Sequence, residues 1–169
     1  MTGLLFVDTN VLVYSRDARE PDKQVRARQW LEYLWREQLG RTSTQVLSEY
    51  YNTLTRKIRP EVAPEKAWDS VSALFAWRPQ AIDSDLLERA RLIERRHRLS
   101  WWDSLIVGAA QLQTCAVLLT EDLQNGCVYG SVTVLNPFTT AVAEAHASYE
   151  AAPVAVHRRR PRGRPKKTL

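Results

Sequence analysis

Apolar and polar stretches alternate along the chain in a way that predicts strands and helices in turn. The first stretch, Leu4–Val7, is a run of four apolar residues, which is typical of a strand buried on both faces. After Pro21, apolar residues recur at helical spacing, which predicts an amphipathic helix that closes at Gly40 and carries Trp30 and Trp35 on one face.

The same patterns continue to the end of the apolar part of the chain. Thr42-Ser43-Thr44 is a capping signal for a second helix. Further helices are expected over residues 45–57, 65–77, 83–97 and 101–113, and strands near 81–82, 116–119 and 132–135. Strands that alternate with helices indicate an α/β fold with a parallel sheet.

Length and charge divide the chain into a body and a tail. The 169 residues suit one domain with a proper core. Seven cationic residues and no acid follow residue 150. Their charge of +7 exceeds the net charge of +5 of the whole chain, so the body before them is slightly negative. We expect a domain over residues 1–140, a linker over 141–157 and a basic, disordered tail over 158–169.

Composition narrows the class of protein further. No apolar run approaches the ~18 residues of a membrane span, and the N-terminus has no leader pattern, so we expect a cytoplasmic protein without membrane contact. The two cysteines and three histidines lack ligand spacing, which makes a zinc site improbable.

Four acids are candidates for a common site. Asp8 and Asp122 follow expected strands, at the edge where sites of parallel sheets lie. Asp103 forms a capping box with Ser100, and Glu49 lies on a helix with no obvious basic partner. Each acid also has an ordinary explanation, as a turn, cap, loop or solvated helix residue.

Taken together, the segments that carry these acids resemble the PIN-domain family, and most of all its VapC-type toxins. The resemblance covers about residues 4–138 and rests on the stretches LLFVDTNVLVYS, TSTQVLSEYYNTLTRK, HRLSWWDSLIVGAA, VLLTEDLQNG and SVTVLNPF. It implies a three-layer α/β/α fold and a catalytic acidic site formed by Asp8, Glu49, Asp103 and Asp122.

The resemblance also implies the residues around that site. Thr9, Asn10 and Thr120 would support the carboxylates. Asn125 stands in a loop where family members often carry a further acid, so it would serve as a neutral ligand or anchor water.

Four clustered carboxylates repel one another unless a cation neutralises them. All-oxygen ligands favour Mg²⁺ or Mn²⁺, which Asp8, Asp103 and Asp122 would hold. The expected activity is metal-dependent hydrolysis of RNA phosphodiesters by an endoribonuclease that acts as a toxin. The family further suggests a homodimer and a small antitoxin partner.

The basic tail offers a separate candidate function. It contains Arg162-Gly163-Arg164-Pro165, which resembles the AT-hook and would bind A·T-rich DNA in the minor groove. A non-specific polyelectrolyte arm is the alternative explanation.

Two other functions remain possible at this point. A haloacid-dehalogenase-like phosphatase also begins with a strand and an aspartate, but it needs a second aspartate where this chain has Asn10. A non-catalytic DNA-binding regulator would use the tail and keep the acidic pocket as a docking site.

Overall fold

A sheet of parallel strands forms the centre of the computed structural model, which describes residues 3–145. Its strand order is β2-β1-β3-β5-β4, and only β4 runs antiparallel, against β5. The strands are β1 (Leu5–Val7), β2 (Gly40–Arg41), β3 (Val117–Leu119), β4 (Val128–Tyr129) and β5 (Val132–Leu135). All residues of β1 and β3 are buried, as expected for the middle of a parallel sheet.

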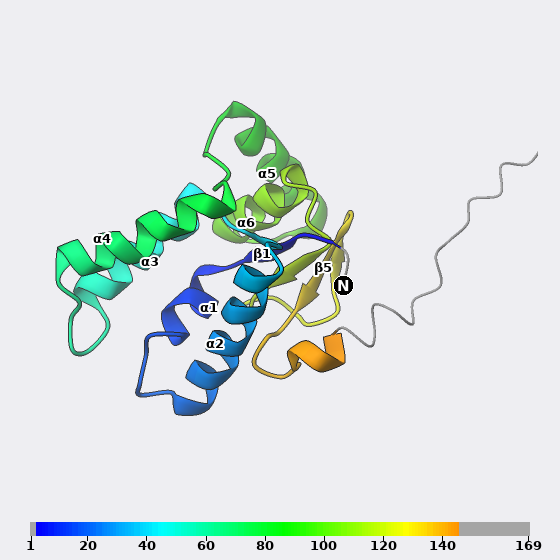
Figure 1. Cartoon of the computed structure of the whole chain (residues 1–169). Coiled ribbons are helices and arrows are strands. Elements are labelled where there is room, and N and C mark those ends of the chain that lie inside the picture. Colours follow the sequence, from blue (N-terminus) through cyan, green and yellow to red (C-terminus); the bar gives the residue numbers. More distant parts are fainter. Residues whose placement is uncertain (1–2, 146–169) are drawn as a thin grey trace, which may run out of the picture.

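Helices cover both faces of this sheet. Figure 1 shows α1 and α2 below the sheet, α5 and α6 above it, and α3 and α4 side by side as an arm. The helices are α1 (Thr9–Tyr14), α2 (Pro21–Arg36), α3 (Thr44–Arg56), α4 (Pro64–Ala73), the 3₁₀ helix η1 (Leu74–Trp77), α5 (Ser84–His97) and α6 (Trp101–Leu112). The predicted α/β/α fold is thereby confirmed.

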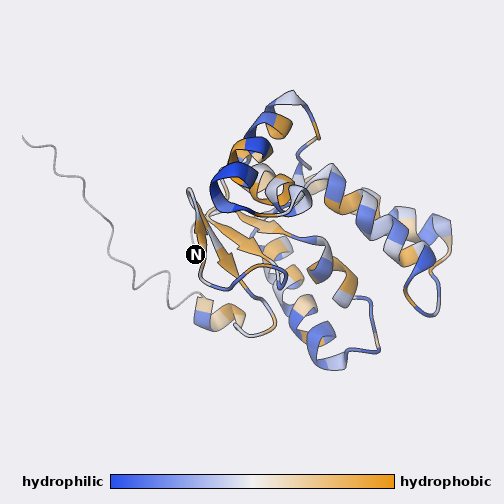
Figure 2. Cartoon of the chain, turned by 180° about the vertical axis from the view of Figure 1, so that it is seen from behind, coloured by the Kyte–Doolittle hydropathy of each residue, from blue (hydrophilic) through white to orange (hydrophobic). Residues whose placement is uncertain are grey.

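Hydropathy explains these layers. In Figure 2 the strands are mostly orange, whereas the helices show blue residues on their outer sides. Burying the apolar faces of helices on an apolar sheet removes them from water, which is the main driving force for this arrangement. None of the helices within residues 3–145 is long and apolar enough to cross a membrane.

Local signals placed most helix starts correctly. Pro21 begins α2, and the hydroxyl of Ser43 caps α3 by accepting the N–H of Val46. Asp83 caps α5 in the same way, and Ser100 caps α6. These side chains satisfy amide groups that the first helical turn leaves without a partner.

Several predicted boundaries were wrong. The helix from Pro21 ends at Arg36 because Gln38 takes a left-handed conformation (φ 57°), and Gly40 belongs to a strand instead. The helix expected over 65–77 changes to 3₁₀ geometry at Leu74.

The strand predicted near 81–82 does not form. Gln80 makes only an isolated bridge to Ser43, and Ile82 is 46% exposed, so this segment buries no face that would hold it in the sheet. Trp30 is buried as expected, but Trp35 is 42% exposed and rests against Trp77 with ring centroids 5.0 Å apart.

The predicted linker and tail lie mostly beyond residue 145, where the described residues end. Residues 142–145 are helical. The rest of the predicted linker, and the AT-hook-like tail, lie beyond the described residues.

Close packing at Gly40 gives a test of the fold. We expect Gly40→Ala to destabilise the protein by about 1–3 kcal/mol, because overpacking strains a core and the added Cβ would lie 2.4 Å from the Trp77 ring. Urea unfolding measures the change. Gly108→Ala is the control and should destabilise less, since its Cβ would lie 3.1 Å from the Leu86 side chain and needs a smaller shift of its neighbour. Equal midpoints for Gly40→Ala and the wild type would contradict this packing.

Candidate active site

Asp8 lies at the point where the central strand β1 becomes helix α1. Its Oδ1 accepts the N–H of Thr9 at 2.6 Å and so caps the helix. Only 8% of Asp8 is exposed, because the strand that carries it is buried on both faces. The sequence therefore places a carboxylate in the interior, at the carboxyl edge of the sheet.

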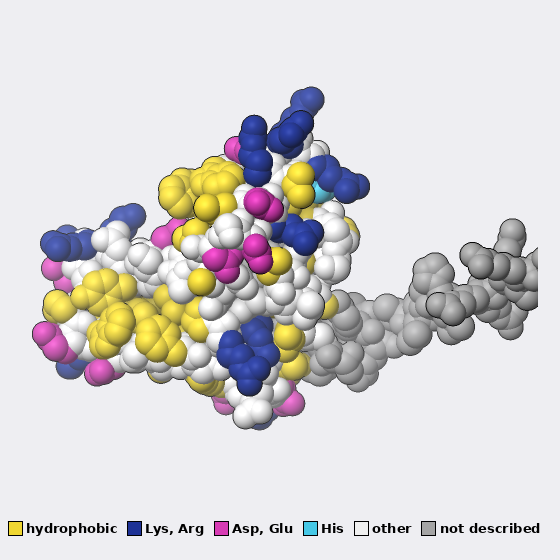
Figure 3. Space-filling view, turned by 90° about the horizontal axis from the view of Figure 1, so that it is seen from above, with side chains coloured by type: hydrophobic (Ala, Val, Ile, Leu, Met, Phe, Trp, Pro, Cys, Tyr) yellow, Lys and Arg dark blue, Asp and Glu magenta, His cyan; other side chains and the backbone are white. Residues whose placement is uncertain are grey.

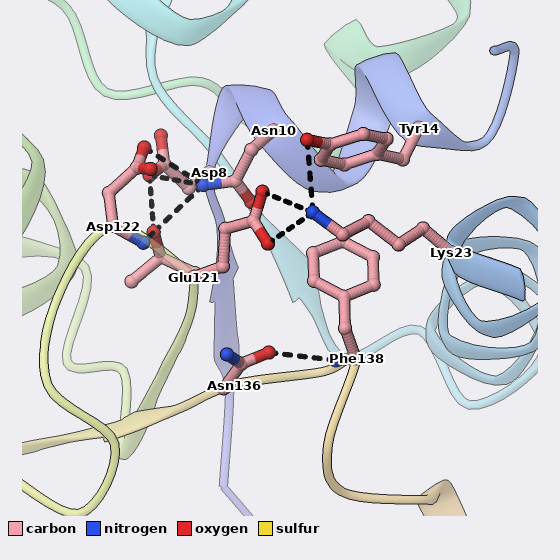
Figure 4. Close-up of polar contacts among 9 residues, drawn as sticks. Asp8, Asn10, Tyr14, Lys23, Glu121, Asp122, Asn136 and Phe138 are labelled. Atoms are coloured by element: carbon pink, nitrogen blue, oxygen red, sulfur yellow. Dashed lines mark hydrogen bonds and ion pairs between the residues drawn. The ribbon is translucent and has the colours of Figure 1, made fainter. Parts of the chain in front are cut away.

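A network of hydrogen bonds joins Asp8 to Asp122 (Figure 4). The hydroxyl of Thr120 donates to Asp8 Oδ2 at 2.7 Å and accepts the N–H of Asp122 at 3.1 Å. The Asn10 amide Nδ2 donates to Asp8 Oδ2 (3.3 Å), to Thr120 Oγ1 (3.0 Å) and to Asp122 Oδ2 (3.0 Å). β1 and β3 are adjacent strands, which brings these residues together.

Glu49 reaches the same network from helix α3. Its Oε2 accepts the hydroxyl of Thr9 at 2.9 Å, and Thr9 is also the residue whose N–H binds Asp8. The other oxygen, Oε1, accepts Nε2 of Gln45 at 3.1 Å. Sequence reasoning did not single out Gln45, although its position four residues before Glu49 on one helix face is the signal that could have revealed it.

Asp103 lies on the first turn of α6 and bonds to its own cap. Its N–H donates to Ser100 Oγ at 3.1 Å, which confirms Ser100 as the cap of α6. The Asp103 carboxylate accepts the Ser100 hydroxyl at 2.6 Å rather than the Ser100 backbone N–H, so the second bond of a capping box is not formed among the described residues. Because α6 leads by a short turn into β3 and packs on it, its first turn lies at the carboxyl edge of the sheet. Within residues 3–145, no hydrogen bond links Asp103 to the Asp8 network.

Two nearby residues face other partners. Asn125 uses its Oδ1 to accept the N–H of Asn136 at 2.8 Å, which fixes the loop that carries it. Figure 4 shows that Glu121 points away from Asp122 and toward Lys23, with which it forms an ion pair of 2.7 Å. Lys23 also donates to the Tyr14 hydroxyl at 3.1 Å.

Burial has the largest effect on the electrostatics of Asp8. Burial raises the pKa of Asp8 from 3.8 to about 6, and the charges of Asp122 and Glu49 act in the same direction. Hydrogen bonds from Thr120 and Thr9 lower this pKa but do not offset burial. The ionised form of Asp8 is therefore costly unless a cation approaches it.

The oxygen atoms around Asp8 are suitable ligands for a hard cation. None of the ion pairs within the described residues includes Asp8, Glu49, Asp103 or Asp122, and Asn10 Oδ1 is buried without a hydrogen-bond donor. Carboxylate, amide and hydroxyl oxygens are the ligand types that Mg²⁺ prefers. No group of three or more His, Cys, Asp or Glu side chains in residues 3–145 is close enough to hold a metal ion. The candidate ligands that hydrogen bonds bring together are thus the carboxylates of Asp8 and Asp122 and the neutral oxygens of Asn10 and Thr120.

Comparison with known proteins identifies the family of the chain. The sequence model of the PIN domain matches residues 5–124, and the chain belongs to the PIN-domain family. No curated protein gives a significant match.

Two solved structures share the fold. A toxin–antitoxin complex from Klebsiella pneumoniae contains a chain with 21% sequence identity and a TM-score of 0.57, over 79% of this chain and 97% of that one. VapC20 of Mycobacterium tuberculosis, described as a sarcin–ricin loop cleaving toxin, has 22% identity and a TM-score of 0.50, over 70% of this chain and 91% of that one.

The raised pKa of Asp8 predicts a pH-dependent effect of Asp8→Asn on stability. The folded wild type holds a proton on Asp8 more tightly than the unfolded chain, so its stability falls as pH rises from about 4 to about 6. Asn cannot ionise. In EDTA we expect the variant to gain up to about 3 kcal/mol over the wild type across this range and to keep that gain above it. Urea unfolding at several pH values measures it, and a gain that does not change with pH would contradict the prediction.

Proposed function

We propose that this protein is an Mg²⁺- or Mn²⁺-dependent endoribonuclease that acts as the toxin of a toxin–antitoxin pair. The observation that carries the proposal is the buried carboxylate of Asp8, which is bonded through Asn10 and Thr120 to Asp122 and has no basic partner among residues 3–145. In a PIN fold this network lies at the sheet edge where sites of parallel sheets form.

Asp8, Asp122 and Asp103 are the residues that we propose to hold the metal ion. When bound, such an ion lowers the pKa of water and neutralises charge on a phosphodiester. Asn10 orients the carboxylates of Asp8 and Asp122, because its amide donates to both. Thr120 orients the carboxylate of Asp8 and holds the backbone N–H of Asp122. The approach of Asp103 to the other two acids remains a prediction.

Glu49 is the proposed base of the reaction. Thr9 and Gln45 each bind one of its oxygens, which fixes the carboxylate beside Asp8 while leaving it exposed. It would accept a proton from the attacking water as the new P–O bond forms, and the departing oxygen of the broken P–O bond would take up a proton. Such hydrolysis does not require the 2′-hydroxyl of RNA. The choice of RNA is supported by the resemblance to VapC toxins.

The proposed partner is a small antitoxin protein. It is supported by the two similar structures, of which one is a toxin–antitoxin complex and the other a cleaving toxin. A homodimer stays a prediction. No contact within the described residues favours the DNA-binding regulator, and Asn10, which donates to two carboxylates, does not supply the acid that a dehalogenase-like phosphatase needs.

Cleavage of single-stranded RNA tests the proposal. We expect cleavage with Mg²⁺, loss of cleavage in EDTA and recovery when Mg²⁺ is restored. Asp8→Asn and Asp103→Asn should each lower the rate by about 100-fold or more, because each removes a charged metal ligand. Asp69→Asn on α4 is the control, since it removes an exposed acid away from the network. Metal-independent cleavage, or cleavage of phosphomonoesters alone, would overturn the proposal.

Metal binding can be measured without the reaction. Mg²⁺ should raise the melting temperature of the wild type, because a bound cation stabilises the folded state that holds it and offsets the buried charge of Asp8. The rise should be smaller in Asp8→Asn and unchanged in Asp69→Asn. Equal shifts in all three proteins would contradict a metal site at Asp8.

A further inference from the structure

The last turn of α5 carries a group of arginines that form no ion pair. Arg95, Arg96 and Arg98 are exposed, and within residues 3–145 the ion pair of this helix joins Arg91 to Glu94 instead. In Figure 3, seen from above, dark blue side chains gather on the α5 side of the molecule. Cations at a helix C-terminus favour the helix dipole, but that benefit is small. The helix dipole alone therefore does not account for three exposed arginines at this helix end.

An exposed indole lies on the next helix, beside one of the candidate acids. Trp102 is 62% exposed on the first turn of α6 and directly precedes Asp103, whereas its neighbour Trp101 packs against the core. Several large apolar side chains of the described residues are exposed, and Trp102 is the one that directly precedes a candidate acid. It presents a flat aromatic surface to solvent next to Asp103 in the sequence.

The turn between the two helices brings these features together. Arg98 ends α5 in a left-handed conformation (φ 55°, ψ 33°), so the chain reverses and α6 begins only three residues later, at Trp101. The two helices pack closely, because a Cβ added at Gly108 would lie 3.1 Å from Leu86. His97, the last residue of α5, packs its ring against that of Tyr129, with ring centroids 5.0 Å apart. The arginines, Trp102 and Asp103 thus share one end of the helix pair.

We propose that Trp102 stacks on a base next to the cleaved phosphodiester, and that Arg95, Arg96 and Arg98 bind phosphates of the same single strand. This proposal rests on the proposed ribonuclease function. Aromatic rings combined with cations are the usual surface for single-stranded nucleic acid, because every base has a π-face and every linkage a negative charge. Protein interfaces also use Trp and Arg, so the binding of RNA itself is the measurement that decides.

Kinetics of RNA cleavage with Mg²⁺ test the role of Trp102. Trp102→Ala should raise KM about ten-fold and change kcat by less than about three-fold, because stacking binds substrate without taking part in the chemical step. Trp102→Phe should recover most of the loss. Trp68→Ala is the control, since Trp68 is 54% exposed on α4, in the arm drawn away from α6 (Figure 1). The KM of this control should match that of the wild type.

Binding in EDTA tests the same surface without cleavage. Single-stranded RNA should quench the fluorescence of the wild type and of Trp68→Phe, and quench Trp102→Phe clearly less. The combined variant Arg95→Gln, Arg96→Gln, Arg98→Gln should lower the slope of log affinity against log salt by about 2, at roughly 0.7 per single-strand contact. Lys66→Gln on α4 should leave the slope unchanged.

The two proposals fail in different ways. If RNA is cleaved but Trp102→Ala and the arginine variant keep wild-type KM, quenching and salt slope, the stacking surface is overturned and the ribonuclease stands. If these variants lose thermal stability without losing RNA affinity, their role is structural and the surface is likewise overturned. If the wild type binds RNA through Trp102 but does not cleave it with Mg²⁺ or Mn²⁺, the ribonuclease fails instead.

Discussion

The buried negative charge at the end of β1 is the constraint around which the rest of the structure is arranged. Asp8 is held in the interior by a strand that cannot be exposed without losing the centre of the sheet. Thr9, Thr120 and Asn10 supply hydrogen bonds but no positive charge. Burial of an uncompensated carboxylate reduces stability, and the cation that we propose for this site would offset that cost.

The fold could be predicted where the signal is local. Helix caps such as Ser43 and Asp83 act within four residues, and the buried strands β1 and β3 are short apolar runs. Helix α1 was missed because it begins at Thr9, directly after its cap Asp8 and without a loop, and its residues Val11–Val13 continue the apolar run of the strand. β2 and β4 have two residues each and exist through their pairing with β1 and β5, which a single segment does not reveal.

The candidate site could be predicted only in part, because its contacts join residues that are far apart in the sequence. Asp8 and Asp122 follow strands, so their edge of the sheet was predictable, and the resemblance added Glu49 and Asp103. The contact of Asn10 with Thr120 joins residues 110 positions apart, and that of Lys23 with Glu121 joins residues 98 positions apart. No spacing rule in the sequence encodes such pairs. They follow from the order of strands, which places β3 beside β1.

An acidic site that acts on a polyanion has an electrostatic difficulty of its own. The carboxylates of Asp8, Glu49 and Asp122 repel phosphate as well as one another, so attraction must come from outside the network. Lys23 does not supply it, because Glu121 and Tyr14 already take up its ammonium group. The arginines at the end of α5 have no such partner among the described residues, and the turn at Arg98 brings them to the helix end that carries Asp103. In the proposed function, the acids that would hold a cation lie apart from the arginines that would bind the RNA, so one small domain could do both.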